Sequence, residues 1–416
     1  MGKAQVGDTR AIVTQAVENA EITDVHTHLY PPGFGDLLLW GIDEQLVFHY
    51  LVAEAFRWIE MPYDRFWAMP KRDQADLIWK TLFLDRSPIS EACVGVLRTQ
   101  KLLGLDVASR DLEAFREFFA GLTTKQYVAR VFEAARVKEV VMTNDPFDPS
   151  ERAVWLDGHE ADPRFRAALR LDPLLMSWPD ACRQLRGWGY DVEEGLGLKT
   201  RAEVRRFLED WVRRIDALYM AVSLPPDFML PDQSPRGLIV EHCILPVCRE
   251  LDRPFSLMLG VKKRVNRGLQ LAGDAVGKCD LRALEYLLAH HPRTKFMATV
   301  LARENQHELV VLARKFRNLL VFGCWWFMNN PVLIDELTRM RTEMLGLAFV
   351  PQHSDARVLD QLLYKWDHFK RIVIPILTDR YEAMAACGWQ ATEAEIKRDV
   401  AALFGGNFRR FLKINL

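Results

Sequence analysis

The sequence lacks the features that direct a chain into a membrane or through a secretory route. It contains no stretch of about 18 uncharged apolar residues, which is the length that a membrane-spanning helix requires. Its first 20 residues contain no apolar core of the kind found in signal peptides. Its seven cysteines are odd in number and form no Cys-x-x-Cys pair, which argues against a disulfide framework. We therefore expect a cytoplasmic protein with no membrane partner.

The sequence also lacks an excess of charge of either sign. Its 55 Lys and Arg residues balance 56 Asp and Glu residues, so neither nucleic acid nor an acidic surface is expected as a partner. The 416 residues, 49% of them hydrophobic, are enough for one large core, and a single α/β barrel with an insertion reaches this size. The expected partner is a small molecule. A homo-oligomer is compatible with the sequence, which does not determine the oligomeric state.

Eight short apolar or β-branched runs that end in polar residues recur along the chain. These runs are 22–29, 137–146, 165–173, 217–226, 254–264, 295–305, 318–327 and 345–357. Amphipathic stretches with helical spacing, such as 201–217 and 306–316, separate most of them. Alternation of buried strands with helices predicts a parallel sheet closed into a (β/α)8 barrel, with the polar strand ends gathered at one rim.

The interval between the first two runs is too long for one crossover. It contains several amphipathic stretches, and we expect residues 30–135 to form a helical insertion over the barrel mouth. The barrel itself would then consist of residues 1–29 and 136–416, with helices from residue 360 onward completing its wall. The last of these helices is expected to span residues 393–412.

The first run carries a His-x-His motif at His26 and His28. Alternate strand residues share one face, so the two imidazoles could bind one metal ion. The alternative is that the two histidines merely flank Thr27 without binding an ion.

The last run supplies Asp355 and Arg357 from the strand expected beside the first one. Together with the two histidines, Asp355 would complete a site for one divalent metal ion, with Zn²⁺ favoured and Mn²⁺ an alternative. Asp355 could instead cap the helix that follows it. The fourth, fifth and sixth runs offer no ligand for a second metal, so we expect a mononuclear site.

Several separate motifs resemble those of the uronate isomerases. They are DVHTHL (24–29), HYLVAE (49–54), TNDP (143–146), RLDP (170–173), FGCWWF (322–327), SDAR (354–357) and NFRRFL (407–412). Their order and spacing are similar to a shorter, divergent branch of that family and extend along essentially the whole chain. The resemblance implies an α/β fold: a distorted (β/α)8 TIM barrel of the amidohydrolase type, with a helical insertion after the first strand.

The resemblance also implies an activity and a set of site residues. The family interconverts D-glucuronate with D-fructuronate, and D-galacturonate with D-tagaturonate, by moving a proton between C2 and C1. Carried over motif by motif, the metal ligands would be His26, His28 and Asp355. The groups that move the C2 proton would be His49 and Tyr50, and the groups that face the substrate would be Arg357, Arg170 and Trp325 or Trp326. One departure is that Met258 stands where the better-known branch has a histidine at the end of the fifth strand.

Each of these residues also has an ordinary structural interpretation. Tyr50 could pack in the core with His49 bonded to its hydroxyl, and it could act as a base only if nearby cations lower its pKa from about 10. Arg170 could bind the carboxylate of a sugar acid through its planar guanidinium, or pair with Asp172 or Asp145.

Two further expectations concern the tryptophans and Asp355. If Trp325 and Trp326 lie at a strand end, alternation would turn one ring inward and the other outward. Asp355 is expected to transfer a proton as well as bind the metal, because an aldose–ketose isomerisation also moves a hydroxyl proton.

Two alternative functions remain open from the sequence. A mononuclear hydrolase or decarboxylase on the same barrel could use the same His, His and Asp ligands to activate water. A non-catalytic sugar-acid binding protein could retain the pocket without turnover, and Met258 is compatible with this alternative.

Overall fold

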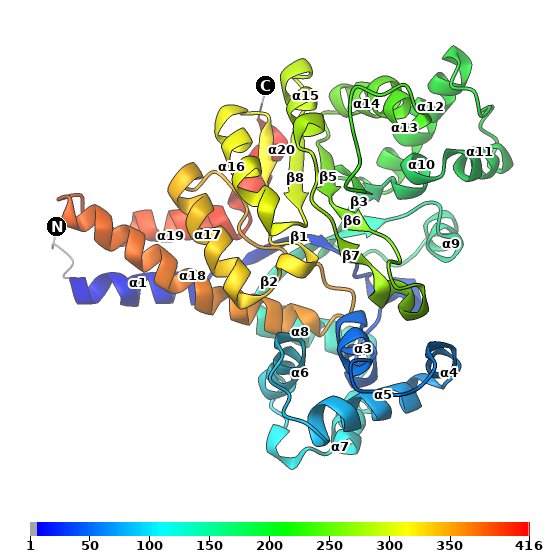
Figure 1. The fold of residues 1–416 in the computed structure, drawn as a ribbon. Coiled ribbons are helices and arrows are strands. Elements are labelled where there is room, and N and C mark those ends of the chain that lie inside the picture. Colours follow the sequence, from blue (N-terminus) through cyan, green and yellow to red (C-terminus); the bar gives the residue numbers. More distant parts are fainter. Residues whose placement is uncertain (1–5, 415) are drawn as a thin grey trace.

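The computed structural model describes residues 6–414 and residue 416, and a curled sheet of seven parallel strands lies at its centre (Figure 1). The strands follow the order β1-β2-β3-β4-β5-β8-β9. Their bounds are Ile22–Thr27 (β1), Val137–Asn144 (β2), Phe165–Arg170 (β3), Met220–Leu224 (β4), Phe255–Leu259 (β5), Phe296–Val300 (β8) and Leu319–Val321 (β9). These strands fall within the first seven predicted runs and confirm the α/β fold. A short antiparallel hairpin of β6 (Val261–Lys262) and β7 (Ala275–Val276), which the sequence did not predict, follows β5.

The eighth predicted run does not form a regular strand. Residue 350 makes an isolated parallel bridge with Phe322, where its N–H donates to Val321 and its carbonyl accepts from Gly323. Five residues later the Asp355 N–H donates to the His26 carbonyl. This irregular segment therefore joins β9 to β1 and occupies the eighth position of a distorted barrel.

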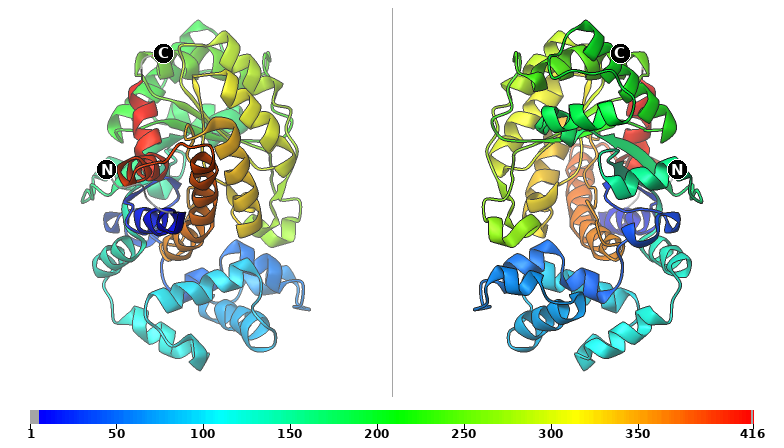
Figure 2. Two further views of the ribbon diagram at one scale, coloured as in Figure 1. Left: turned by 90° about the vertical axis from the view of Figure 1, so that its left-hand side faces the viewer. Right: turned by 90° about the vertical axis from the view of Figure 1, so that its right-hand side faces the viewer.

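Helices surround the sheet, as Figures 1 and 2 show. Outside residues 30–135 they are α1 (Val6–Glu18), α9 (Pro149–Asp157), α10 (Asp172–Met176), α11 (Trp178–Gly187), α12 (Leu198–Arg214), α13 (Pro235–Ile239), α14 (Leu245–Glu250), α15 (Arg282–His290), α16 (Gln306–Lys315), α17 (Pro331–Leu345), α18 (Gln361–Ala386), α19 (Glu393–Ala401) and α20 (Asn407–Lys413). The long helix α18 packs against α1 and α17. In the part of the chain that the structure describes, no helix combines the length and apolar character needed to cross a bilayer.

Residues 30–135 are largely helical. Their helices are α2 (Ile42–Leu46), α3 (His49–Ala55), α4 (Tyr63–Trp67), α5 (Lys71–Trp79), α6 (Glu91–Leu102), α7 (Leu112–Ala120) and α8 (Thr124–Ala135). Helices α3 to α7 gather on one side of the barrel in the views of Figures 1 and 2. Helices α6 and α8 pack on α18, and α3 packs on residues 267–273 after the hairpin strand β6. The division of the chain into an insertion and a barrel at residues 30 and 135 stays a prediction.

Two apolar clusters fill the structure. The larger one lies between the sheet and the helices and within the helical region. The smaller one takes a buried residue from every strand of the sheet: Val25, Val141, Ala168, Ala221, Met258, Met297 and Leu320. It therefore fills the interior of the curl, where Phe408 and Phe411 of α20 join it.

The sequence from 393 to 412 was expected to be a single helix, and the structure divides it. A π segment, Ala402–Gly406, separates α19 from α20, and Gly405 adopts a φ of 144° within it. A Cβ on Gly405 would lie 2.7 Å from Cβ of Thr23 on β1. Both the backbone conformation and the close approach to β1 therefore require glycine.

Replacing Gly405 with Ala is expected to lower the free energy of unfolding by about 2–4 kcal/mol, from backbone strain and overpacking against Thr23. Gly187→Ala is the matched control, because its added Cβ would meet nothing within 4 Å and its φ is not positive. Denaturant midpoints of the two variants and the wild type check this. Equal midpoints for all three would contradict the prediction.

Candidate metal and active site

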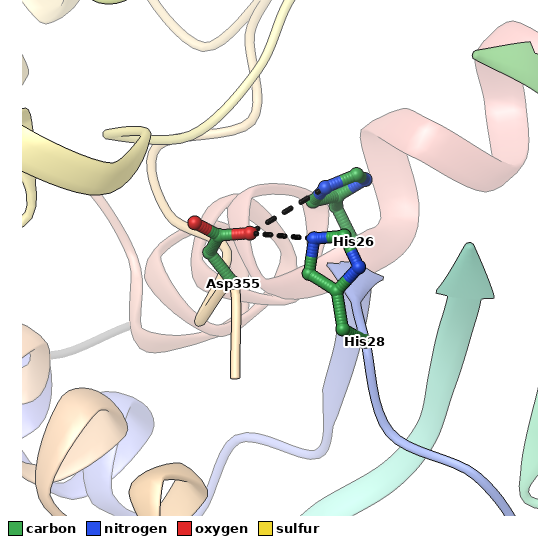
Figure 3. A group of neighbouring side chains, drawn as sticks. All are labelled: His26, His28 and Asp355. Carbon is green, nitrogen blue, oxygen red and sulfur yellow. Dashed lines mark ion pairs between the residues drawn. The ribbon is translucent and has the colours of Figure 1, made fainter. Parts of the chain in front are cut away.

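Three side chains assigned to a metal from the sequence lie together at the carboxyl end of β1. Nε2 of His26 is 3.6 Å from Oδ1 of Asp355, and Nε2 of His28 is 3.3 Å from the same oxygen. Figure 3 shows both imidazoles turned toward that oxygen. One ligand atom from each residue can be chosen so that all lie within 4.8 Å of one another, and no second group of this kind occurs among the described residues.

The donor set fits a divalent cation. Burial lowers the pKa of His26 and of His28 to about 3, so both imidazoles are neutral at pH 7. Burial alone would raise the pKa of Asp355, and the positive charge of Lys365 opposes that shift. Nε2 of His26 and Oδ1 of Asp355 are buried without a hydrogen-bond partner. Buried nitrogen and oxygen atoms without a hydrogen-bond partner are suited to binding a shared metal ion.

The backbone at Asp355 is held in an uncommon conformation. Asp355 has a φ of 51°, in the left-handed region. The preceding residue, Ser354, is held on both sides: its N–H donates to Asp24 at 3.0 Å, and its carbonyl accepts from Nζ of Lys365. Nε1 of Trp366 donates to the same Asp24 carboxylate at 2.9 Å. The buried Asp24 and Lys365 thus fix the segment that carries Asp355, a candidate metal ligand.

Asp355 is not a helix cap. The N-cap of α18 is Asp360, so the alternative interpretation of Asp355 does not apply. Asp360 instead accepts hydrogen bonds from the Gly41 N–H at 2.8 Å and from Nε2 of Gln45 at 2.8 Å, which ties the start of α18 to the helical region.

Two cavities with a partly shared lining lie beside His26, His28 and Asp355. The inner one has a volume of 20 Å³, and the outer one has a volume of 420 Å³. Their shared lining consists of His28, His49, Thr143, Arg170 and Arg357. A ligand of sugar size would therefore extend from the inner cavity into the outer one.

The inner cavity gathers eight of the nine side chains that the sequence singled out. Those lining it are His26, His28, His49, Arg170, Trp325, Trp326, Asp355 and Arg357, and Tyr50 is the one that does not. These residues come from widely separated segments and meet at the carboxyl ends of the strands, where barrel enzymes place their active sites.

The two arginines face the cavities in different ways. Arg170 ends β3 and donates to Oδ1 of Asp172 at 2.8 Å. Arg170 therefore forms one of the expected ion pairs and also lines the inner cavity. Oδ2 of Asp172 accepts from the Ser223 N–H at 3.2 Å, which ties the pair to β4. Arg357 lines both cavities, and burial lowers its pKa, although Asp355 opposes this shift.

His49 and Tyr50 begin α3 and have different environments. Both ring nitrogens of His49 lack a hydrogen-bond partner, so His49 does not bond to the Tyr50 hydroxyl. Burial lowers the pKa of His49 well below 6.5, which keeps its ring neutral. Burial, and then Asp355, raise the pKa of Tyr50 well above 10, so the condition under which Tyr50 could act as a base is not met.

Trp325 and Trp326 both line the inner cavity and are both buried. The expected alternation, with one ring inward and one outward, is therefore wrong. The physical reason is that β9 ends at Val321, and Trp326 has a φ of 48° at the start of a 3-10 turn, so the pleat of a strand no longer applies. Met258 of β5 lies in the same lining, at the position noted for its departure from the family pattern.

Four further residues act on this site and were missed by the sequence interpretation: Asp24, Lys365, Thr143 and Tyr219. Asp24 stood within the quoted DVHTHL motif, whereas Lys365 carries no local signal, because Asp367, Lys370 and Arg371 follow it closely in the same helix. Burial lowers the pKa of Lys365 to about 8 and raises that of Asp24 to about 6. Thr143 stood within the quoted TNDP motif, whereas Tyr219 carries no local signal, because tyrosine is common in strands.

Comparison with known proteins gives a consistent result. No family model matches the chain, and no curated protein matches it. Among solved structures, a uronate isomerase from Bacillus halodurans C-125 is 55% identical, with a TM-score of 0.98, and the match covers 100% of this chain and 98% of that one. A uronate isomerase from Thermotoga maritima is 14% identical, with a TM-score of 0.79 and coverage of 97% of each chain. A glucuronate isomerase from Caulobacter crescentus is 15% identical, with a TM-score of 0.78 and coverage of 98% of this chain and 94% of that one. At such low identity the last two show a shared fold alone.

Proposed function

The chain belongs to the uronate isomerase family and is an isomerase, and from this premise we propose that it interconverts D-glucuronate with D-fructuronate and D-galacturonate with D-tagaturonate. The observation that carries the proposal is the convergence of two neutral imidazoles, one carboxylate and two guanidinium groups on a single cavity. The substrate pairs are those that the family resemblance implies. The hydrolase and the non-catalytic binder considered from the sequence lose their basis, because a protein 55% identical over the full chain is a uronate isomerase.

We propose that His26, His28 and Asp355 hold one divalent ion, with Zn²⁺ preferred. Two nitrogen donors and one carboxylate oxygen are a ligand set that zinc enzymes use while leaving positions open. When bound, such an ion polarises the substrate oxygens and stabilises the negative charge that develops on them. The preference for Zn²⁺, a cytoplasmic location and a homo-oligomeric state stay predictions.

The reaction requires a base for the proton on C2. His49 is the best-placed group, because its ring is neutral, has no protein partner and lines both cavities. We assign to it the acceptance of the C2 proton and its return to C1. Tyr50 follows directly on α3 with its phenol protonated, so it can donate a proton but does not compete as the base.

A second proton must move from the hydroxyl on C2 to the oxygen on C1. With both transfers, the ketose product has the same atoms as the aldose substrate. Asp355 is suited to carry it. Figure 3 shows one of its carboxylate oxygens turned toward the histidines and the other turned away from them. The second oxygen is available to accept and return the proton, while the first is held at the ligand group.

The carboxylate of a uronate needs a cationic partner. Arg170 is oriented by Asp172 and presents its guanidinium to the shared lining of both cavities, and Arg357 lies in the same lining. A guanidinium can form two parallel hydrogen bonds with a carboxylate. The buried Trp325 and Trp326 supply apolar surface against which a sugar ring carbon face can pack.

The function is tested by stripping the protein of metal, restoring Zn²⁺ or Mn²⁺, and supplying D-glucuronate and D-galacturonate in D2O. We expect formation of the corresponding keto acid, with deuterium incorporated at C1 or C2 from the exchangeable base. Aldonic acids of the same length, which lack the aldehyde, are the control and should remain unchanged. Failure to convert either uronate with either metal would contradict the proposed function.

A further inference from the structure

The two ligand histidines share an arrangement that the mechanism above does not use. Nδ1 of His26 lies 3.3 Å from the hydroxyl of Tyr219, and that hydroxyl donates to the Val25 carbonyl at 2.8 Å. Nδ1 of His28 lies 3.0 Å from the hydroxyl of Thr143, which donates to the Thr27 carbonyl at 2.8 Å. In both cases one hydroxyl bridges the ring and the carbonyl of the residue just before it.

The direction of these hydrogen bonds follows from counting protons. A hydroxyl has one proton to donate, and a backbone carbonyl can only accept. Since each hydroxyl lies 2.8 Å from a carbonyl oxygen, its proton belongs to that contact. If the hydroxyl instead donated to the ring, two oxygens with only lone pairs between them would face each other at 2.8 Å in a buried site. The hydroxyl oxygen therefore accepts, and the ring Nδ1 carries the hydrogen.

Placing the hydrogen on Nδ1 determines the state of Nε2, on the opposite side of each ring. A neutral imidazole with its hydrogen on Nδ1 has a lone pair on Nε2. Nε2 is the atom that faces Oδ1 of Asp355 in both histidines. Two nitrogen lone pairs then point at a carboxylate oxygen, which is unfavourable unless a cation lies among them.

We infer that Tyr219 and Thr143 are positioning residues that hold His26 and His28 in the Nδ1-protonated form required for binding the metal through Nε2. Each acts through its histidine and neither is assigned contact with the substrate. The inference rests on the metal-binding part of the proposed function and extends it to the residues that preset the ligands.

The two hydroxyls reach the histidines from different parts of the sheet. Thr143 is near the end of β2, which pairs directly with β1, whereas Tyr219 immediately precedes β4 and crosses the interior of the curl. Tyr219 is 0% exposed and Thr143 is 3% exposed, so water does not readily replace either hydroxyl. Hydrogen bonds from the far ring nitrogen of a metal-binding histidine commonly set its tautomer and orientation.

The test replaces each hydroxyl with a group of similar shape, in Tyr219→Phe and Thr143→Val, with Thr143→Ser as the matched control that keeps a hydroxyl. The dissociation constant of Zn²⁺ from metal-stripped protein is measured by competition with a chelating dye. We expect each of the first two variants to bind Zn²⁺ about 10–100-fold more weakly. Thr143→Ser should stay much closer to the wild type.

A spectroscopic readout separates positioning from a general loss of structure. In ¹⁵N-histidine-labelled, metal-free wild type, His26 and His28 should show the chemical shifts of the Nδ1-protonated form, with assignments made by His26→Gln and His28→Gln. In Tyr219→Phe the His26 signals should move toward a tautomer mixture while those of His28 stay unchanged, and Thr143→Val should give the reverse. A purely structural role of either hydroxyl would not change the tautomer of one histidine while leaving the other histidine unchanged.

Several outcomes would overturn the inference. One is Zn²⁺ affinity in Tyr219→Phe and Thr143→Val equal to that of the wild type, and another is an Nε2-protonated form in the wild type. Wild-type protein that binds no Zn²⁺ would remove both this inference and the metal site. Wild-type protein that binds Zn²⁺ with the expected tautomers but converts neither uronate would contradict the proposed function alone.

Discussion

Replacing Asp355 with Asn is expected to reduce kcat by about 10³-fold or more, because the change removes both the proposed anionic metal ligand and the oxygen proposed to carry the hydroxyl proton. Asn keeps the shape of Asp355, and the hydrogen bonds of the Ser354 backbone with Asp24 and Lys365 do not involve the replaced group. Turnover of D-glucuronate and D-galacturonate, measured with metal content by mass spectrometry, checks the prediction.

The metal content of the Asp355→Asn variant distinguishes the two proposed roles of Asp355, metal binding and proton transfer. Loss of both metal and turnover assigns its main role to binding, whereas retained metal with lost turnover assigns it to proton transfer. Asp335→Asn is a control of the same chemistry on α17, since Asp335 pairs with Arg339 at the surface and should leave turnover unchanged. A variant of Asp355 with near wild-type kcat would contradict both roles.

Replacing His49 with Gln is expected to lower kcat by about 10²–10⁴-fold while KM and metal content change little. The reason is that Gln fills similar space but cannot accept a proton at neutral pH. His49 has no hydrogen-bond partner to lose, so the variant should fold normally. Loss of the His49 imidazole should also abolish deuterium incorporation from D2O, which is measured by mass spectrometry of the product.

The same assignment has a consequence for pH. A base acts in its unprotonated form, and burial lowers the pKa of His49 well below 6.5. As pH falls, the fraction of neutral His49 therefore declines only below 6.5, and the acid limb of the kcat/KM profile should lie there. An acid limb above pH 6.5 would count against His49.

Tyr50→Phe provides the decisive comparison for His49. If His49 is the base, Tyr50→Phe should retain deuterium incorporation and lose less activity than His49→Gln. The reverse order of effects would assign the base to Tyr50. His307→Gln is a surface control, because His307 lies exposed on α16 and away from both cavities.

The strands of the barrel could be predicted because burial leaves a strong local signal. A strand of a parallel sheet covered on both faces must be apolar along its length, and seven of the eight runs are such strands. The run at 345–357 was predicted equally but is irregular. Pro351 has no N–H to donate, and the left-handed backbone of Asp355 breaks any continuous pairing. The apolar pattern therefore predicted the place of this segment in the barrel but not its conformation.

The helical stretches show the same limit. The amphipathic pattern of 393–412 continued through Gly405, so a single helix was expected. The break arises from the close approach of Gly405 to Thr23, a contact between residues more than 380 positions apart. Likewise, Trp325 and Trp326 were assigned the alternation of a strand because nothing in their sequence marks the end of β9.

The sequence by itself determined which side chains could bind a metal and at which strand ends they would stand, because a His-x-His motif in an apolar run combines ligand chemistry with strand periodicity. Only the tertiary structure decided which nitrogen of each histidine faces Asp355, which hydroxyls contact the rings, and which charged side chains bind Ser354 before Asp355. These contacts join residues between 11 and 330 positions apart. Their geometry depends on how whole strands and helices pack, and no local pattern of residues records it.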